Sequence, residues 1–146
     1  MKQPRYWIDV ASKDHVLKGV EGDFCQLCHG KNNPLKRLNP GDWIIYYSLR
    51  TALNNGERVQ VFTAIGQVLA GEPYRFDIKG GFVPYRRDVQ FVAAQETPIR
   101  SPISDLTFIK SKQSWGYVFR FRLLEIPEPD FRRVTAAMKA EVSVTL

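Results

Sequence analysis

Runs of aromatic and β-branched residues dominate the hydrophobic pattern of this chain, and such runs favour the extended conformation. They predict strands over residues 5–10, 42–48, 59–69 and 82–94. Residues 113–125 show the most regular alternation and predict another strand. Phe119 would lie on its apolar face, and Arg120 and Arg122 on the opposite face.

Three segments carry helical signals. Ser12 is a favourable N-cap for a short helix that ends near residue 20. Ser101 followed by Pro102 predicts a second short helix, because proline suits the first helical position. After Pro127, an apolar stripe at helical spacing predicts a third helix; its members are Phe131, Val134, Met138 and Val142.

Strands therefore predominate, with about six strands and about three helices, and few strands are separated by a long helix. This order argues against a doubly wound parallel sheet. It predicts an α+β fold with a curved sheet or a small barrel.

Residues 22–48, with the sequence GDFCQLCHGKNNPLKRLNPGDWIIYYS, concentrate the chemically distinctive side chains. Glycines and prolines interrupt this stretch, so it predicts an irregular loop of about twenty residues before the strand near Asp42. Long loops in compact domains are usually functional. We therefore expect the binding or reactive surface here.

Length and charge narrow the class of protein. The 146 residues are the size of one domain, so residues 1–146 are expected to form a single unit. The 21 basic and 15 acidic side chains give a net charge of +6, which favours an anionic partner such as nucleic acid. No apolar segment has the length of a signal peptide core or a membrane span. A cytoplasmic protein with no membrane partner is expected.

The string Cys25-Gln26-Leu27-Cys28-His29 suggests several chemistries. A c-type haem site, a redox pair, a zinc site and a hydrolytic Cys–His pair are each possible, but each lacks supporting context. The favoured interpretation is that both cysteines pack as small apolar residues. No cofactor or metal is therefore expected, and a thiol-dependent enzyme that uses Cys25, Cys28 and His29 is kept as an alternative.

Basic side chains near the same loop suggest phosphate contacts. Gly30-Lys31 is only a weak match to a nucleotide-binding loop, because the other required residues are missing. Phosphate contact is nevertheless predicted for Lys31, Arg37, Arg86 and Arg87.

The string FCQLCHGKNNPLKRL, followed by PGDWIIYYS, resembles the core of the EVE domain, a PUA-like family related to YTH domains. Residues 6–8 (YWI), residues 62–66 (FTAIG) and the Trp115-Gly116 pair agree with this resemblance. It implies a PUA-like fold, with a mixed and strongly curved sheet or small barrel flanked by helices.

The resemblance also implies a function: binding of a modified or flipped base, such as methylated cytosine in DNA or a modified base in RNA, without catalysis. Trp7 and Trp115 would form the walls of an aromatic pocket. At Asp9 this chain departs from the YTH relatives, which carry a basic residue there, and two roles stay open: its carboxylate would accept a hydrogen bond from an exocyclic amine, or it would repel phosphate. The remaining ligand-binding residues would be Phe24, Gln26, His29, Tyr47 and Ser48. A free small molecule such as a nucleoside is an alternative ligand, and any downstream effect would need unidentified effector proteins.

Overall fold

The computed structural model describes residues 3–26, 32–52, 54–78, 81, 83–109, 116, 119–120 and 122–140. Its strands are β1 (Tyr6–Val10), β2 (Phe24–Cys25), β3 (Trp43–Arg50), β4 (Arg58–Val68), β5 (Tyr74–Arg75), β6 (Tyr85–Val92), β7 (Thr97–Pro98) and β8 (Leu123–Ile126). The helices are α1 (Lys13–Gly22), α2 (Asn32–Lys36), the 3-10 helix η2 (Ile103–Asp105) and α3 (Glu128–Ala137).

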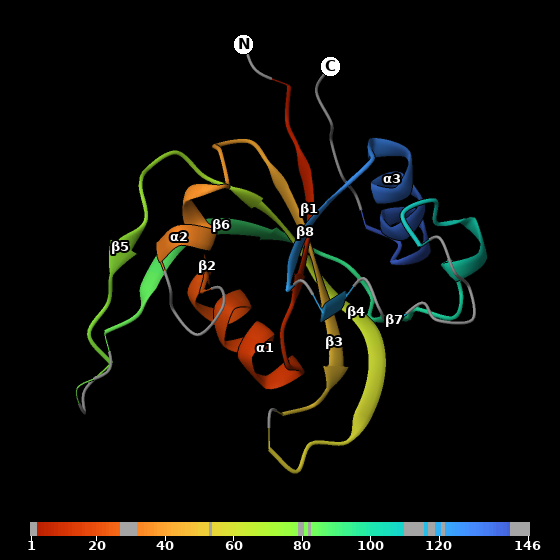
Figure 1. Cartoon of the computed structure of the whole chain (residues 1–146), viewed down its shortest axis with the longest axis horizontal. Helices are drawn as coiled ribbons and strands as arrows, with labels where there is room; N and C mark the ends of the chain where they lie inside the picture. Colours follow the sequence, from red (N-terminus) through yellow and green to blue (C-terminus); the bar gives the residue numbers. More distant parts are fainter. Residues whose placement is uncertain are drawn as a thin grey trace.

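The strands form a curled mixed sheet in the order β2-β6-β4-β3-β1-β8, with β5 beside β6 and β7 beside β4 (Figure 1). Strand β1 lies parallel to β3 and antiparallel to β8, and it pairs Tyr6 with Trp43 and with Ile126. The β3–β4 register shifts between Tyr46 and Tyr47 and again before Arg50. Such irregularities increase local twist and bend a sheet. The resulting six-stranded half-barrel with three helices confirms the predicted fold class.

Both faces of the sheet are covered. Tyr6 and Ile8 of β1 pack in a core with Phe131 and Val134 of α3. Trp7, between them in sequence, packs in a second core with α1 and α2 residues. Alternate side chains of a strand point to opposite faces, so α3 and the α1–α2 pair lie on opposite sides of the sheet (Figure 1).

Most of the predicted elements are present. The strands near residues 5–10, 42–48 and 59–69 and the helix after Ser12 are confirmed. The third predicted helix is also confirmed as α3, with Phe131, Val134 and Met138 fully buried. The strand predicted over residues 82–94 is shorter in the structure, where β6 spans Tyr85–Val92. The short helix predicted after Ser101 is η2, which begins after Pro102.

The strand predicted over residues 113–125 is wrong in its extent. Phe119 and Arg120 lie in a helical turn, and β8 begins only at Leu123. Arg122 has a φ of 53°, which is incompatible with an extended strand. The Phe119 ring stacks on Tyr47, with centroids 4.2 Å apart. This local packing overrides the alternating pattern.

The expected irregular loop before Asp42 also contains regular structure. Phe24–Cys25 form β2, which pairs with β6, and Asn32–Lys36 form α2. None of the helices in the described ranges is long and apolar enough to cross a membrane. That residues 1–146 form a single domain stays a prediction.

Candidate functional site

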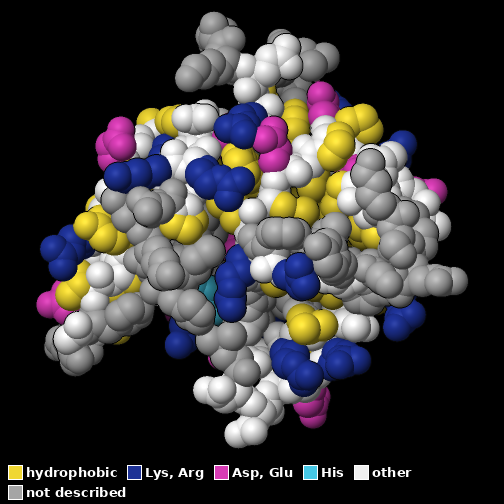
Figure 2. Space-filling view, viewed as in Figure 1, with side chains coloured by type: hydrophobic (Ala, Val, Ile, Leu, Met, Phe, Trp, Pro, Cys, Tyr) yellow, Lys and Arg dark blue, Asp and Glu magenta, His cyan; other side chains and the backbone are white. Residues whose placement is uncertain are grey.

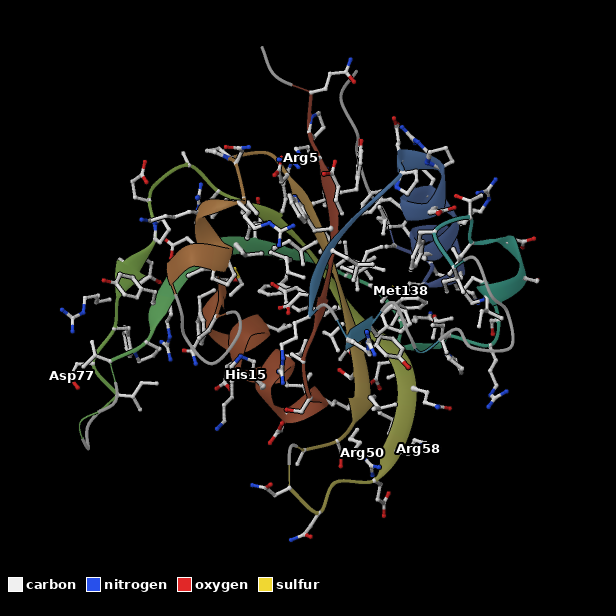
Figure 3. The ribbon with its side chains drawn as sticks, in the orientation of Figure 1. Arg5, His15, Arg50, Arg58, Asp77 and Met138 are labelled. Carbon is white, nitrogen blue, oxygen red and sulfur yellow. The ribbon has the colours of Figure 1, made fainter. Side chains whose placement is uncertain are left out.

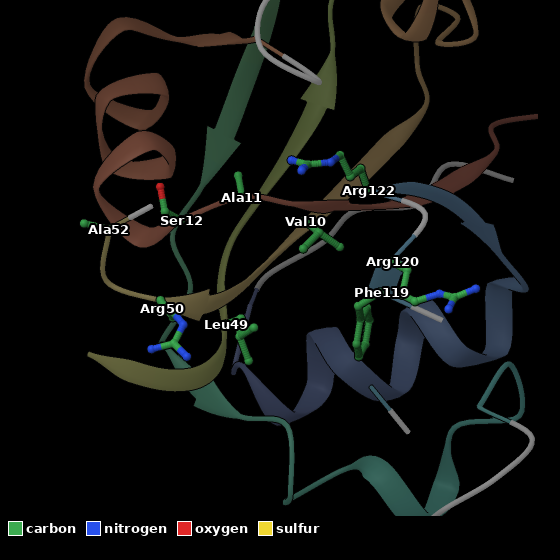
Figure 4. A pocket seen from close by; sticks show the side chains of 9 residues that line it. All are labelled: Val10, Ala11, Ser12, Leu49, Arg50, Ala52, Phe119, Arg120 and Arg122. Atoms are coloured by element: carbon green, nitrogen blue, oxygen red, sulfur yellow. The ribbon is translucent and has the colours of Figure 1, made fainter. Parts of the chain in front are cut away.

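Two neighbouring cavities flank residues 9–16, where β1 ends and α1 begins. The larger has a volume of about 230 Å³ and is lined by residues of β1, β3 and the segment before β8. Figure 4 shows Val10 and Leu49 between Arg50 on one side and Phe119 with Arg120 on the other. The walls therefore combine apolar side chains with arginines.

Backbone hydrogen bonds fix the position of this cavity. The Val10 amide donates to the carbonyl oxygen of Arg122 at 2.6 Å, and the Ala11 amide donates to that of Tyr47 at 3.0 Å. These bonds hold the end of β1 between β3 and the segment that carries Phe119. Ser12 then serves as the N-cap of α1, as predicted, and lines the same cavity.

The larger cavity is electropositive. Arg50, Arg120 and Arg122 line it, and no aspartate or glutamate is found in that part of its lining that the structure describes. Lys and Arg side chains gather over the end of β3 and the start of β4, where Arg50 and Arg58 lie (Figures 2 and 3). A guanidinium matches carboxylate and phosphate oxygens in two-point hydrogen bonding. This surface can therefore hold an anion.

The smaller cavity has a volume of about 10 Å³, which is room for one water-sized group. It lies between α1, β2 and β3, and its polar lining comes from Asp9, His15, Cys25, Gln26 and Tyr46. The His15 Nε2 atom lies 2.9 Å from the Gln26 carbonyl oxygen. Phe24, which is half-buried, completes the wall.

Burial controls the ionisation of the side chains that line this smaller cavity. It raises the pKa of Asp9 to about 8, while the positive charge of Arg122 opposes the shift. Burial, followed by the nearby Asp9, also raises the pKa of the Cys25 thiol far above its ordinary value. Burial also raises the pKa of Tyr46, and the neighbouring Cys25 and then Asp9 raise it further. The raised pKa values favour the protonated form of all three groups.

The structure brings three of the predicted ligand-binding residues together, because Asp9, Phe24 and Gln26 line the smaller cavity. The predictions for His29, Trp115 and Lys31 lie outside the described residues, as does Cys28.

The expected role of Trp7 as a pocket wall is contradicted. Its side chain is fully buried, and its indole N–H donates to Asp42 Oδ2 at 3.0 Å. The guanidinium groups of Arg5 and Arg37 lie over the ring, 4.7 and 4.9 Å from its centroid. Trp7 therefore presents no free face to a ligand.

Tyr47 and Ser48 are also core residues rather than lining residues. Tyr47 packs against Phe119 and Phe62, and the Ser48 hydroxyl accepts a hydrogen bond from Thr63 Oγ1 at 2.6 Å. Both side chains are at most 1% exposed. The prediction that Tyr47 and Ser48 contact a base directly is therefore corrected: both side chains pack within the core.

The predicted phosphate-binding residues separate into two kinds. Arg87 is buried and donates to the carbonyl oxygens of Leu38 at 3.0 Å and Leu69 at 3.4 Å, so its role is structural and the prediction is corrected. Arg37 is exposed, and its phosphate contact stays a prediction.

Arg86 is half-buried and also stays a prediction. Its guanidinium lies between the rings of Phe24 and Phe76, 3.8 and 4.0 Å from their centroids. The Arg86 Nε atom donates to Gln26 Oε1 at 3.1 Å.

Sequence reasoning missed the arginines of the larger cavity. Arg120 and Arg122 were placed on the outer face of a strand that does not form there, and Arg50 ends a strand that continues beyond the predicted boundary. Among the described residues, no group of three or more histidine, cysteine, aspartate or glutamate side chains could hold a metal ion.

Comparisons with known proteins show to which family this chain belongs. Residues 5–137 match the EVE domain. The "UPF0310 protein in gntR 5'region" of Bacillus licheniformis is 52% identical over 127 residues, which are 87% of this chain and 86% of that protein. The UPF0310 protein YdcG of Bacillus subtilis is 41% identical over 138 residues, which are 94% of each chain.

Solved structures show the same fold at low identity. The crystal structure of Atu2648 from Agrobacterium tumefaciens has a TM-score of 0.54 at 15% identity, covering 90% of this chain and 91% of that one. The NMR structure of Rpa0253 from Rhodopseudomonas palustris has a TM-score of 0.53 at 14% identity, covering 92% and 93%. The fold is of the PUA-like type, and the chain belongs to the EVE domain family.

Proposed function

We propose that this protein is a non-catalytic module that binds nucleic acid through a modified or flipped base. The observation that carries the proposal is the larger cavity, where three arginines and Ser12 join apolar side chains and no carboxylate is present among the described lining residues. An EVE domain with a PUA-like fold is compatible with such a module.

The chemistry of the larger cavity suits the sugar and phosphate of a nucleotide. Arg50 and Arg122 are exposed, and Arg50 donates from Nη1 to the Gly56 carbonyl oxygen at 3.2 Å. The other N–H groups of these two guanidiniums can donate to phosphate oxygens. Val10 and Leu49 supply an apolar surface for the sugar. Unpairing a base costs a few kcal/mol, and such arginine contacts offset that cost.

The smaller cavity has room for only one small group at the edge of a base. It lies on the other side of the same segment, and the charge of Arg122 acts on Asp9. Phe24 offers an aromatic ring, and Asp9 and Gln26 offer polar groups for a base edge. Base–aromatic stacking contributes roughly 1–3 kcal/mol per base.

A thiol-dependent reaction receives no support from Cys25. That thiol is 2% exposed, and burial with the nearby Asp9 disfavours the thiolate that a nucleophile requires. A free nucleoside remains the competing ligand, because it would use the same base-reading groups without engaging the arginines.

The test is a binding titration at two salt concentrations. The probes are single- and double-stranded DNA and RNA, plain or carrying methylated cytosine or methylated adenine, together with the free nucleosides. Tighter binding of one modified oligonucleotide, weakened by salt, supports the proposal. Salt-independent binding of nucleosides, with no gain from the oligonucleotide, would replace it with the free-ligand alternative.

A further inference from the structure

Strand β5 lies at an open edge of the sheet. It pairs with β6 on one side, where Tyr74 lies opposite Arg86, and no described strand pairs with its other side. The arm that carries β5 extends away from the body of the sheet, and Asp77 lies toward its outer end (Figures 1 and 3). The unpaired backbone groups of an edge strand are a template for pairing with another chain.

The hydrogen bonds between β5 and β6 determine which backbone groups face outward. The Phe76 amide donates to the carbonyl oxygen of Pro84 at 2.9 Å, so the backbone polar groups of Phe76 face β6. In an antiparallel pair, such positions alternate with positions whose N–H and C=O groups point away from the partner strand. The backbone N–H and C=O groups of Arg75 and Asp77, on either side of Phe76, therefore point to the open edge.

The side chains of the same segment form two sets. Tyr74, Phe76 and Ile78 are 37%, 45% and 38% exposed, although each is large and mainly apolar. They occupy alternate positions, with Arg75 and Asp77 between them on the other face. Both charged side chains are exposed, and neither forms an ion pair among the described residues. The segment therefore presents an uncovered apolar face and two unpaired charges of opposite sign.

We propose that two copies of this protein associate through β5, in an antiparallel pairing centred on Phe76. The sequence of residues 74–78, Tyr-Arg-Phe-Asp-Ile, is complementary to itself in that register. Arg75 lies opposite Asp77 of the second copy, Phe76 lies opposite Phe76, and Tyr74 lies opposite Ile78. The two-fold axis repeats the contact between Arg75 and Asp77 and closes the assembly at a dimer.

Backbone geometry and charge select the same register. In it, the outward N–H and C=O groups of Arg75 meet those of Asp77 in the second copy, which gives a hydrogen-bonded pair on each side of Phe76. A register centred on Arg75 would oppose two guanidinium groups and would place Pro73, which has no N–H, opposite Asp77. A register centred on Asp77 would oppose two carboxylates. Of these three registers, the one centred on Phe76 alone pairs opposite charges.

Contacts within each copy hold the two aromatic rings of this surface in place. The Arg86 guanidinium lies between the rings of Phe76 and Phe24, 4.0 and 3.8 Å from their centroids. The Tyr74 hydroxyl donates a hydrogen bond to Asp88 Oδ1 at 2.8 Å. Because both rings are restricted before association, little side-chain freedom is lost when a second copy binds.

The interface is small, so we expect a weak dimer. Five residues from each chain bury less surface than the roughly 1,200–2,000 Å² of a stable protein–protein interface. The dimer should therefore form at protein concentrations of about 0.1–1 mM and dissociate on dilution. This inference does not depend on the proposed nucleic-acid binding, and its test contains no nucleic acid.

Charge exchange tests the pairing in the whole chain by sedimentation equilibrium. Arg75→Asp and Asp77→Arg each place like charges opposite each other, and each variant alone should associate more than about tenfold more weakly than the wild type. An equimolar mixture of the two variants should dimerise, because the carboxylates of one then face the guanidinium groups of the other. Dimerisation of the mixture also shows that both variants are folded.

The matched control is Arg100→Asp, because Arg100 is exposed and lies outside β5. This variant should dimerise as the wild type does. A wild-type protein that stays monomeric up to about 1 mM overturns the proposal. A dimer that survives in both single variants also overturns it, because the contact then lies elsewhere on the chain. Single variants that dissociate and whose mixture stays monomeric would contradict the pairing of Arg75 with Asp77.

Discussion

The indole N–H of Trp7 donates a hydrogen bond to Oδ2 of Asp42 at 3.0 Å, within a fully buried part of the structure. This bond joins β1 to the residue that ends the turn over residues 39–42 and directly precedes β3. Asp42 also accepts hydrogen bonds from the backbone amides of Arg5 and Asn39, both at 3.0 Å. Trp7 and Asp42 therefore fix the parallel pairing of β1 and β3, on which both cavities depend.

Replacing Asp42 with asparagine should destabilise the protein. The amide keeps the shape of the carboxylate but loses an acceptor oxygen, which leaves a buried donor without its partner. The expected loss is about 1–3 kcal/mol in the free energy of unfolding. Urea denaturation measures it, with the exposed Asp88→Asn as the matched control. An unchanged urea midpoint would show that the three hydrogen bonds do not stabilise the fold.

Asp130 should make the stability depend on acid pH. Burial alone would raise its pKa, but hydrogen bonds from the backbone and side chain of Thr107 and from the Phe108 amide lower it overall. Because the folded-state pKa lies below the unfolded value, this stabilisation is present above the unfolded pKa of about 4. It is lost as pH falls through the folded-state pKa.

The variant Asp130→Asn tests this linkage. It should be less stable than the wild type near pH 7, and the difference should narrow as pH falls below about 4. Urea midpoints at several pH values between neutrality and acid give the measurement. A difference that stays constant across this range would assign the effect to packing rather than to the charge.

Arg87 and Arg37 should behave differently on mutation, although both were predicted to contact phosphate. Arg87→Gln removes donors to two carbonyl oxygens in a buried position, and we expect a loss of about 1–3 kcal/mol in stability. Arg37→Gln alters an exposed side chain and removes its contact with the Trp7 ring, so it should cost less, at most about 1 kcal/mol. Thermal denaturation distinguishes the two, and equal stabilities would contradict the structural role of Arg87.

Cys25 should resist thiol reagents in the folded protein. Its side chain is 2% exposed, and its raised pKa disfavours the reactive thiolate. A Cys28→Ser variant isolates this thiol, since the chain has two cysteines. Titration with a disulfide reagent near pH 8 should show little reaction until denaturant is added. Rapid modification of the folded variant would restore the thiol-dependent alternative.

The sequence predicted those elements whose signals, periodicity and capping residues, lie within the element itself. The elements β1, β3, β4, α1 and α3 have clear periodicity or capping residues, and they form close to where they were predicted. The prediction of a strand over residues 113–125 was wrong because the left-handed backbone of Arg122 and the stacking of Phe119 on Tyr47 are tertiary features. Periodicity carries no information on either.

The site was predicted only in part, for a related reason. Asp9, Phe24 and Gln26 line one cavity because α1 connects the end of β1 to β2, as the predicted helix and first strand allow. Trp7 was assigned to a pocket from the family resemblance, and its sequence context does not show that helices cover both faces of the sheet. The arginine-lined cavity forms where the ends of β1 and β3 lie beside the segment before β8. No single stretch of sequence predicts that these three segments come together.

The most direct test of the account is the salt dependence of oligonucleotide binding in the double variant Arg50→Gln/Arg122→Gln. Each lost phosphate contact lowers the slope of log K against log salt concentration by about 0.7 for single strands and about 0.9 for duplex DNA. Arg132→Gln is the matched control, because Arg132 is exposed on α3 and paired with Glu128. We predict a shallower slope and weaker binding in the double variant, and wild-type behaviour in the control. Equal slopes in all three proteins would contradict the assignment of the arginine-lined cavity as the nucleic-acid site.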